Sequence, residues 1–270
     1  MPELPEVETT CRGIAPHIVS KTVEAVIVRQ PKLRWPIPEN IASLIEGQVL
    51  IEVRRRAKYV LLCFARGQVI IHLGMSGSLR ILTWDVPALK HDHFDIQFSD
   101  NTTLRLTDPR RFGAVLWQEE GALLSIFAQL GPEPLEDGFT LAGFLAQAKK
   151  RKTTIKQFIM DNKVVVGVGN IYAAEALFAA GINPNRAANS IGRARMEKLY
   201  TAIKYILGAA ITQGGTTLKD FVGGDGQPGY FAQELQVYGR KGLQCNSCRS
   251  ELREVTLGQR SSVYCPKCQR

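Results

Sequence analysis

The first eight residues, Met1 to Glu8, combine two prolines with three carboxylates, which makes them a candidate for chemistry. Proline at position 2 is small enough that we expect Met1 to be removed, leaving a secondary amine beside Glu3. An α-amino group titrates near pH ~8, so a usable fraction of it is an uncharged nucleophile at neutral pH. A structural interpretation also fits, because Pro5 and the nearby acids are typical of the first turn of a helix. Taken alone, the stretch favours the helix interpretation.

Four of the six cysteines form two Cys-x2-Cys pairs near the end of the chain, with 16 residues between the pairs. The four are Cys245, Cys248, Cys265 and Cys268. Each pair offers two thiolates, and together they complete a tetrahedral zinc site with no position left open for water. The segment between them reads as two strands around a glycine turn, with Arg260 near the tip. We therefore predict a β-ribbon zinc finger with one structural zinc ion, and the alternative of a redox dithiol fits this spacing poorly.

Charge is distributed unevenly along the 270 residues, which carry a formal net charge of +9. Residues 131–270 hold 19 Lys and Arg against 11 Asp and Glu, whereas residues 1–130 hold 15 against 14. A basic half of this kind predicts a polyanionic partner, and nucleic acid before a membrane. A general solubility charge is the alternative. No apolar run approaches the ~20 residues of a membrane span, and the cysteine usage indicates a reduced compartment, so we expect a soluble, cytoplasmic protein.

The hydrophobic pattern predicts an α+β protein in which a leading helix precedes many short strands. Apolar residues recur at helical spacing up to about His17, and the period then changes to that of strands. The predicted strands are Val23–Val28, Val49–Arg54, Tyr59–Phe64, Val69–Leu73, Ser78–Leu82, Phe94–Phe98, Thr103–Leu106 and Phe112–Trp117. Short strands at such spacing indicate an antiparallel sandwich or barrel.

Beyond the proline-rich stretch Gly131–Pro134 the pattern becomes helical. The predicted helices are Thr140–Lys150, Thr154–Asn162, Asn170–Ala180 and Ile191–Gln213. A glycine-rich segment follows, up to Gly229. We predict three domains: an N-terminal β-sandwich (1–130), a helical domain (131–230) and a zinc finger (231–270).

Two polar clusters in the first domain are candidates for phosphate or duplex contact. Arg54–Tyr59 places four cations in five residues, which favours an anion among them, although a solvated hairpin also fits. Asp108–Phe112 combines adjacent arginines with an aromatic residue, a composition suited to insertion into a duplex, although a salt-bridged turn with Phe112 in the core is an alternative. His91-Asp92-His93 is interpreted as a polar loop, because successive residues of a strand face opposite ways and the three would not share one metal ion.

Further along, Val166–Asn170 lacks the third glycine of a dinucleotide-binding loop. Its glycine-rich turn into a helix can still present backbone N–H groups to a phosphate. The cationic run Lys149–Lys152 lies nearby in sequence and favours the same interpretation.

Together these residues resemble the formamidopyrimidine-DNA glycosylases, enzymes that excise oxidised purines. The matching motifs run through the chain in order: Pro2–Glu6, Arg56–Tyr59, His72–Gly77, Asp108–Gly113, Gly167–Tyr172 and the four-cysteine finger with Arg260. The resemblance implies a helix–two-turn–helix module around Asn170 and a bifunctional glycosylase/AP lyase. We expect a bacterial protein that associates with the nucleoid through DNA binding. We also expect a monomer, because a bipartite enzyme that closes on DNA needs only one copy.

The resemblance implies a mechanism that begins with extrusion of the damaged nucleotide from the duplex. Pro2 nitrogen would attack the sugar C1′, displace the base and form a Schiff base. Glu3 would act as general acid/base with Glu6 in support, and β,δ-elimination would then cleave the strand. The family assigns proton-transfer roles to Lys58 and Arg260. Because an arginine stays protonated, we expect Arg260 to act as a phosphate clamp.

The resemblance also implies two sets of contacts with double-stranded DNA that contains an oxidised purine. One set fills the void left by the extruded nucleotide: Met75, Arg110 and Phe112. The other set contacts phosphates: His91, Arg151 and Asn170. The glycine-rich segment Thr216–Tyr230 corresponds to the loop that closes over the lesion.

Three alternatives remain open at this stage. The endonuclease VIII type uses the same amine and finger on oxidised pyrimidines, but Leu4, the void-filling residues and the glycine-rich loop favour the purine branch. A non-catalytic DNA-damage binder would keep the fold without forming a covalent intermediate. A zinc-ribbon transcription or translation factor would have no use for the amino-terminal motif.

Overall fold

The computed structural model describes residues 2–122, 124–215 and 235–270, which fall into two compact units. Of the described residues, the first unit comprises 2–122, 124–128 and 213–215, and the second comprises 129–212 and 235–270. Among the described residues, no helix has the length and apolar character needed to cross a membrane. The mixture of helices and antiparallel sheet confirms the predicted α+β class.

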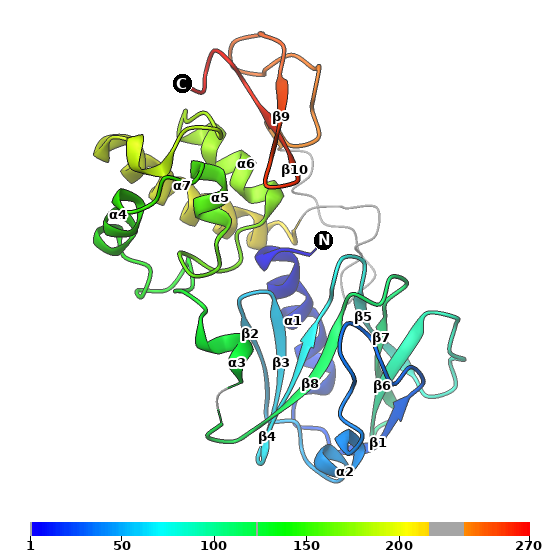
Figure 1. Cartoon of the computed structure of the whole chain (residues 1–270). Helices are drawn as coiled ribbons and strands as arrows, with labels where there is room; N and C mark the ends of the chain where they lie inside the picture. Colours follow the sequence, from blue (N-terminus) through cyan, green and yellow to red (C-terminus); the bar gives the residue numbers. More distant parts are fainter. Residues whose placement is uncertain (1, 123, 216–234) are drawn as a thin grey trace. The chain divides into compact units, whose positions relative to one another are not determined.

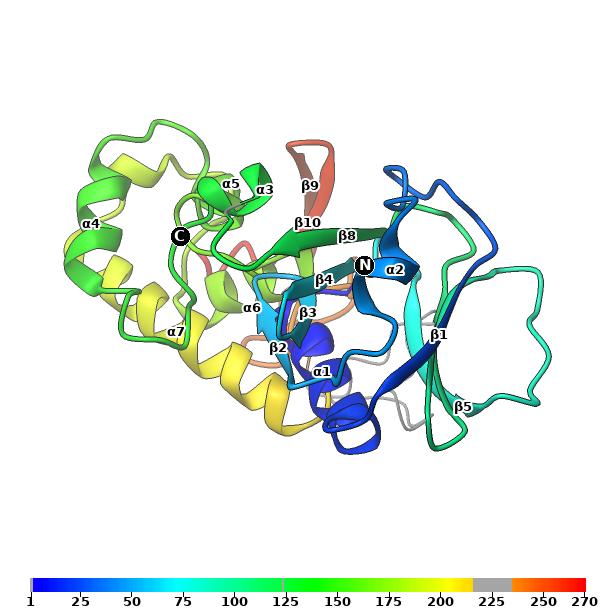
Figure 2. The ribbon, with the colours of Figure 1, turned by 90° about the horizontal axis from the view of Figure 1, so that it is seen from below.

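The first unit is built on two four-stranded antiparallel sheets (Figures 1 and 2). One sheet has the order β1–β6–β7–β5 and the other β2–β3–β4–β8. The strands are β1 (Val23–Val28), β2 (Glu52–Arg56), β3 (Tyr59–Phe64), β4 (Gly67–His72), β5 (Ser78–Thr83), β6 (Asp92–Phe98), β7 (Thr102–Thr107) and β8 (Ala114–Glu119). Every predicted strand is present, with ends that shift by up to three residues.

The core of this unit lies between the two sheets and against helix α1 (Leu4–Ile18). Helix α1 buries one apolar face, formed by Val7, Cys11 and Ile14, in the same cluster as inward-facing residues of both sheets. Burying one such side chain contributes about 1.5–3 kcal/mol. The core therefore fixes the axis of α1, and with it the position of the chain's amino-terminal residues.

A buried ion-pair network joins strands β6 and β7. The Arg105 guanidinium donates to both carboxylate oxygens of Asp95, with Nε–Oδ1 at 3.0 Å and Nη2–Oδ2 at 2.8 Å. Arg29 Nη2 lies 2.7 Å from Asp95 Oδ2, and Arg80 Nη2 lies 2.8 Å from Asp92 Oδ1. The side chains of Asp92, Asp95 and Arg105 are at most 3% exposed. Our interpretation of His91-Asp92-His93 as a polar loop was wrong, because Asp92 and His93 belong to β6 and are buried.

We expect Asp95→Leu to lower the free energy of unfolding by about 3–5 kcal/mol, because it leaves the Arg105 guanidinium buried without its main partner. Urea denaturation provides the measurement. Glu52→Gln is the matched control: it breaks an ion pair with Arg54 whose side chains are 58% and 49% exposed, and such a pair contributes at most about 1 kcal/mol. Equal losses in the two variants would contradict this account.

The second unit contains a helical body whose core includes four aromatic rings. Its helices are α4 (Leu141–Lys149), α5 (Ile155–Met160), α6 (Asn170–Ala179), the 3-10 turn η1 (Ala188–Ser190) and α7 (Arg193–Thr212). Phe139, Phe144, Phe158 and Tyr200 pack with ring centroids 4.8 to 6.2 Å apart. Thr140 and Thr154 cap α4 and α5 through their side-chain oxygens. All four predicted helices are present.

A two-stranded ribbon, β9 (Arg253–Leu257) and β10 (Arg260–Tyr264), packs on the helical body of this unit (Figure 1). Val263 of the ribbon and Leu252, immediately before β9, share a cluster with Ala174 of α6. The buried Lys156 of α5 donates from Nζ to Ser261 O at 3.0 Å and to Ser262 Oγ at 2.6 Å. This lysine thus anchors β10 next to Arg260, the first residue of the strand.

Candidate active site and nucleic-acid interface

The amino-terminal residues are held by the first turn of α1. Pro2 is buried, as are Glu3 and Glu6, which are 2% and 0% exposed. Glu3 N donates to Glu6 Oε2 at 2.9 Å, which is one half of a capping box. This bond fixes the backbone of Glu3 immediately after Pro2. The helix interpretation of the first eight residues is confirmed, because a helix begins at Leu4. The chemical role of Pro2 stays a prediction.

We expect Glu6→Ala to lower the free energy of unfolding by about 1 kcal/mol, because it removes the cap from a buried N–H. The variant also frees the backbone of Glu3, which follows the predicted nucleophile Pro2, so we expect slower reaction at that predicted nucleophile. Glu6→Gln retains an oxygen acceptor and serves as the control. Thermal denaturation and single-turnover rates of both variants give the comparison, and an unchanged melting temperature in Glu6→Ala would contradict it.

Lys58 lies in the two-residue turn between β2 and β3, and Arg55 ties that turn to α1. Arg55 Nε donates to Glu8 Oε2 at 2.9 Å, and Arg55 Nη1 donates to Ala57 O at 3.1 Å. Burial alone would raise the pKa of Glu8, but hydrogen bonds from Arg12 and Arg55 outweigh it and lower that pKa. The Glu8 carboxylate is thus the anion that Arg55 binds. The arrangement connects the early turns of α1 with the turn that carries Lys58.

Three exposed side chains project from two turns of the same unit. Met75 follows β4, and Arg110 and Phe112 lie in the turn between β7 and β8. Met75 is 38% exposed and Phe112 is 46% exposed, which rules out the alternative that Phe112 belongs to the core. The Arg110 guanidinium carbon lies 5.1 Å from the centre of the Phe112 ring. We refer to Met75, Arg110 and Phe112 as the wedge residues.

His91 lies at the base of the Arg110 turn. Its carbonyl accepts a hydrogen bond from Asp108 N at 2.9 Å, and its ring lies 6.3 Å from that of the buried His93. His72 is close to the other turn: its Nδ1 accepts from Gly74 N at 3.0 Å. Burial, followed by the charges of Arg34 and Lys58, lowers the pKa of His72 to about 4. His72 is therefore neutral at pH 7 and keeps this acceptor.

In the second unit, the predicted phosphate contacts occur around the start of α6 and the end of α4. Asn170 is the first residue of α6, which Gly169 caps, and its Oδ1 is buried without a partner among the described residues. Arg151 Nη1 lies 3.6 Å from Asp161 Oδ2 in a half-exposed pair. Arg260 is exposed at the tip of the ribbon, after Gly258 and Gln259, which both have positive φ.

The four cysteines Cys245, Cys248, Cys265 and Cys268 form one metal site. Their Sγ atoms all lie within 4.8 Å of one another, with Cys245–Cys268 at 3.9 Å and Cys248–Cys265 at 3.4 Å. Four sulfurs about 2.3 Å from a tetrahedral zinc are about 3.8 Å apart, so the donor set and spacing fit zinc. Cys268 N also donates to Cys265 Sγ at 3.3 Å. This confirms the predicted structural zinc site, whose ligands come from the segments before β9 and after β10.

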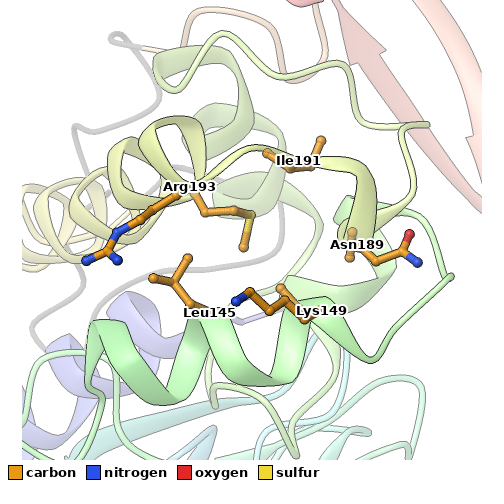
Figure 3. A pocket seen from close by; sticks show the side chains of 8 residues that line it. Leu145, Lys149, Asn189, Ile191 and Arg193 are labelled. Carbon is orange, nitrogen blue, oxygen red and sulfur yellow. The ribbon is translucent and has the colours of Figure 1, made fainter.

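A cavity of about 100 Å³ lies in the second unit, and none of the predicted site residues lines it (Figure 3). Leu145 and Ile191 line it, together with Lys149 and Arg193.

Sequence reasoning missed two buried charged groups that support the site. One is Lys156, which anchors β10. The other is Glu175 of α6, whose carboxylate accepts from the backbone N–H groups of Gln236, Val237 and Tyr238 at 2.8 to 3.0 Å. Both lie in otherwise apolar helical segments, and a charged residue at a core position of the helical period is the signal that could have found them.

The predicted lesion-closing segment, Thr216–Tyr230, lies outside the described residues. So does Met1.

A β-sandwich led by a helix, a helical body and a four-cysteine ribbon together define a class of zinc-containing DNA-repair proteins. Models of the formamidopyrimidine-DNA glycosylase N-terminal domain, of its H2TH domain and of a zinc finger found in FPG and IleRS match residues 1–115, 130–222 and 242–270. This chain belongs to the formamidopyrimidine-DNA glycosylase family.

Individual relatives match this chain over its full length. The chain is 58% identical to a formamidopyrimidine-DNA glycosylase of Pseudomonas entomophila, with all of both chains covered. It superimposes with a TM-score of 0.93, 31% identity and full coverage of both chains on wild-type Lactococcus lactis Fpg in complex with DNA containing N7-benzyl-Fapy-dG. A structure of MutM with DNA containing carbocyclic 8-oxo-G gives a TM-score of 0.92 and 32% identity, also with full coverage.

Proposed function

We propose that this chain is a bifunctional DNA glycosylase and AP lyase that removes 8-oxoguanine and formamidopyrimidines from double-stranded DNA. The observation that carries the proposal is the buried start of α1, where the backbone of Glu3 is held by Glu6 immediately after Pro2. Full-length relatives with the name formamidopyrimidine-DNA glycosylase support it. So do neighbours whose DNA contains Fapy-dG or 8-oxo-G lesions.

Chemistry begins when the Pro2 amine attacks the sugar C1′ of the extruded nucleotide. The C1′–N bond to the base breaks and the base leaves with a proton. The C1′–O4′ bond of the sugar then opens, O4′ takes up a proton, and the Pro2 nitrogen, having lost its own proton, becomes part of an iminium ion. Glu3 transfers the protons at this centre, and Glu6 holds the backbone of Glu3 in place. The iminium acidifies the adjacent sugar carbon C2′, so loss of a C2′ proton expels the 3′ phosphate. Loss of a second proton, from C4′, then expels the 5′ phosphate. Lys58, which lies in the turn between β2 and β3, transfers protons during this elimination.

Binding relies on cations and backbone groups from both units. His91, Arg151 and Asn170 contact phosphates, and Arg260 holds a phosphate as a permanently charged clamp. The wedge residues Met75, Arg110 and Phe112 occupy the space left by the extruded nucleotide. When the zinc ion is bound, it holds the ribbon that carries Arg260. We further propose that the protein acts as a monomer on the DNA of the bacterial cytoplasm, and that its domains are 1–130, 131–230 and 231–270.

Substrate preference tests the proposal. Duplexes with 8-oxoguanine opposite cytosine and duplexes with thymine glycol are compared in single-turnover excision assays. The proposal predicts faster excision of 8-oxoguanine. Faster excision of thymine glycol would place the chain in the endonuclease VIII type, and binding without excision of either lesion would indicate a non-catalytic damage binder.

A further inference from the structure

The two turns that carry the wedge residues touch through two glycines. A Cβ atom on Gly74 would lie 2.5 Å from Gly113 N and 2.6 Å from the carbonyl carbon of Phe112. A Cβ atom on Gly113 would lie 2.7 Å from His72 O. No side chain can stand between the two turns at these distances. The backbone that follows Phe112 and the backbone that precedes Met75 are therefore in direct contact.

Asp108 closes the second of these turns. Its carboxylate Oδ2 accepts from Gly113 N at 2.7 Å, so the first and last residues of the segment 108–113 are joined. Its carbonyl accepts from Arg111 N at 3.2 Å and lies 3.0 Å from His93 Nε2. Its own N–H donates to His91 O. One buried residue thus fixes both the Arg110–Phe112 segment and the backbone of His91.

The other carboxylate oxygen of Asp108, Oδ1, takes no part in these hydrogen bonds. Asp108 is 0% exposed, and its Oδ1 has no hydrogen-bond partner in the part of the chain that the structure describes. A buried, half-satisfied carboxylate is unfavourable for stability, and such groups concentrate where a local geometry matters for function. Arg111 is held at a φ of 54° in the same segment, another conformation that costs stability. These observations point to a positioning role.

We propose that Asp108 is a positioning residue for the wedge: its bond to Gly113, together with the contact between Gly74 and Gly113, holds Met75, Arg110 and Phe112 as one preorganised body. This inference rests on the proposed function, in which the three side chains enter the duplex. A preordered body enters without first losing conformational freedom. The neutral ring of His72 fixes Gly74 from the other side, so both turns are set before DNA arrives.

Two substitutions at Asp108 separate geometry from charge. Asp108→Asn keeps an oxygen acceptor for Gly113 N, whereas Asp108→Leu has the same branched shape and no acceptor. Entry of the wedge is followed by stopped-flow fluorescence of 2-aminopurine placed next to 8-oxoguanine in a duplex. We expect Asp108→Leu to slow the fluorescence change and single-turnover excision by about 10–100-fold, the scale of a 1 Å misplacement. Asp108→Asn should stay within about threefold of the wild type.

A second pair of variants tests the contact between the turns independently. Gly74 and Gly47 have similar backbone angles, with φ of 64° and 75°, but no atom lies within 4 Å of a Cβ placed on Gly47. Gly74→Ala therefore combines the conformational cost of alanine at positive φ with a steric clash against the backbone of Phe112 and Gly113. Gly47→Ala has the conformational cost alone. We expect Gly74→Ala to slow wedge entry at least about tenfold. Gly47→Ala should leave the rate of wedge entry unchanged.

The following results would overturn the inference. One is wedge entry at the wild-type rate in a folded Asp108→Leu or in Gly74→Ala. Another is equal slowing by Asp108→Asn and Asp108→Leu, which would assign the effect to charge. If Asp108→Leu melts at a much lower temperature than the wild type, the comparison of Gly74→Ala with Gly47→Ala decides whether the inference holds. Failure of the proposed function is distinguishable, because the wild-type protein itself would then not excise 8-oxoguanine.

Discussion

A chain that carries Gly-Ser in front of Pro2 should lose covalent trapping on lesion DNA by about 10³-fold or more, the scale of losing a catalytic nucleophile. In such a chain the Pro2 nitrogen is part of a peptide bond, and its lone pair is delocalised into the carbonyl. Borohydride trapping on a duplex with 8-oxoguanine measures the loss. Pro2 is buried at the start of α1, so an extension also tests how much room the site leaves there.

Two controls separate blocked chemistry from blocked binding. Proteolytic removal of the extension should restore trapping, and fluorescence anisotropy on the same duplex reports whether DNA still binds. Pro2→Gly keeps a free, primary amine, so we expect slower base removal with a trapped adduct still formed. Full trapping by the extended chain would exclude the Pro2 nitrogen as the nucleophile.

Loss of the zinc site should have the largest effect on folding. Two strands alone are marginal, and the cluster that β9 and β10 share with α6 is small. Binding of a structural zinc ion supplies roughly 10–16 kcal/mol in isolated fingers. In Cys265→Ser we expect loss of the ion and disorder of the ribbon. Because Arg260 then loses its position, the dissociation constant for lesion DNA should rise about 10-fold or more, the scale of a hydrogen bond to a charged group.

Metal analysis, circular dichroism and anisotropy titrations measure these effects. Cys63→Ser is the matched control, because Cys63 is a buried cysteine of β3 outside the ribbon. It should retain zinc and DNA affinity. Wild-type affinity in a zinc-free Cys265→Ser protein would show that Arg260 does not contact DNA.

Local pattern predicted most of the fold, because strand alternation and helix period leave a strong signal in the sequence. Strand β3 begins at Tyr59 and ends at Phe64 as predicted. The short helices α2 (Ile41–Ile45) and α3 (Ser125–Ala128) were missed, since one turn of helix carries too few residues to show a period. The buried state of Asp92 was missed because its partner, Arg80, pairs with it across the sheet.

The features of the site divide in the same way. Those that follow from local spacing could be predicted, and those that depend on contacts between distant segments could not. The zinc ligands follow from spacing alone, and the structure brings their sulfurs together. The cationic cluster at Arg54–Tyr59 was a candidate for a phosphate contact, with a solvated hairpin as the alternative. Within it, Arg54 pairs with Glu52 and Arg55 pairs with Glu8. Neither the Glu8 pairing nor the contact of Gly74 with Gly113 could be predicted, because each joins segments far apart in the sequence.

The central claim is that the Pro2 nitrogen forms a Schiff base with the sugar of an oxidised purine nucleotide. Its most direct test is to incubate the protein with an 8-oxoguanine duplex and borohydride, digest the adduct and identify the modified peptide by mass spectrometry. We predict that the DNA is attached to a peptide that begins at Pro2. Absence of an adduct when the amino terminus is confirmed as Pro2, or attachment at Lys58, would contradict the claim.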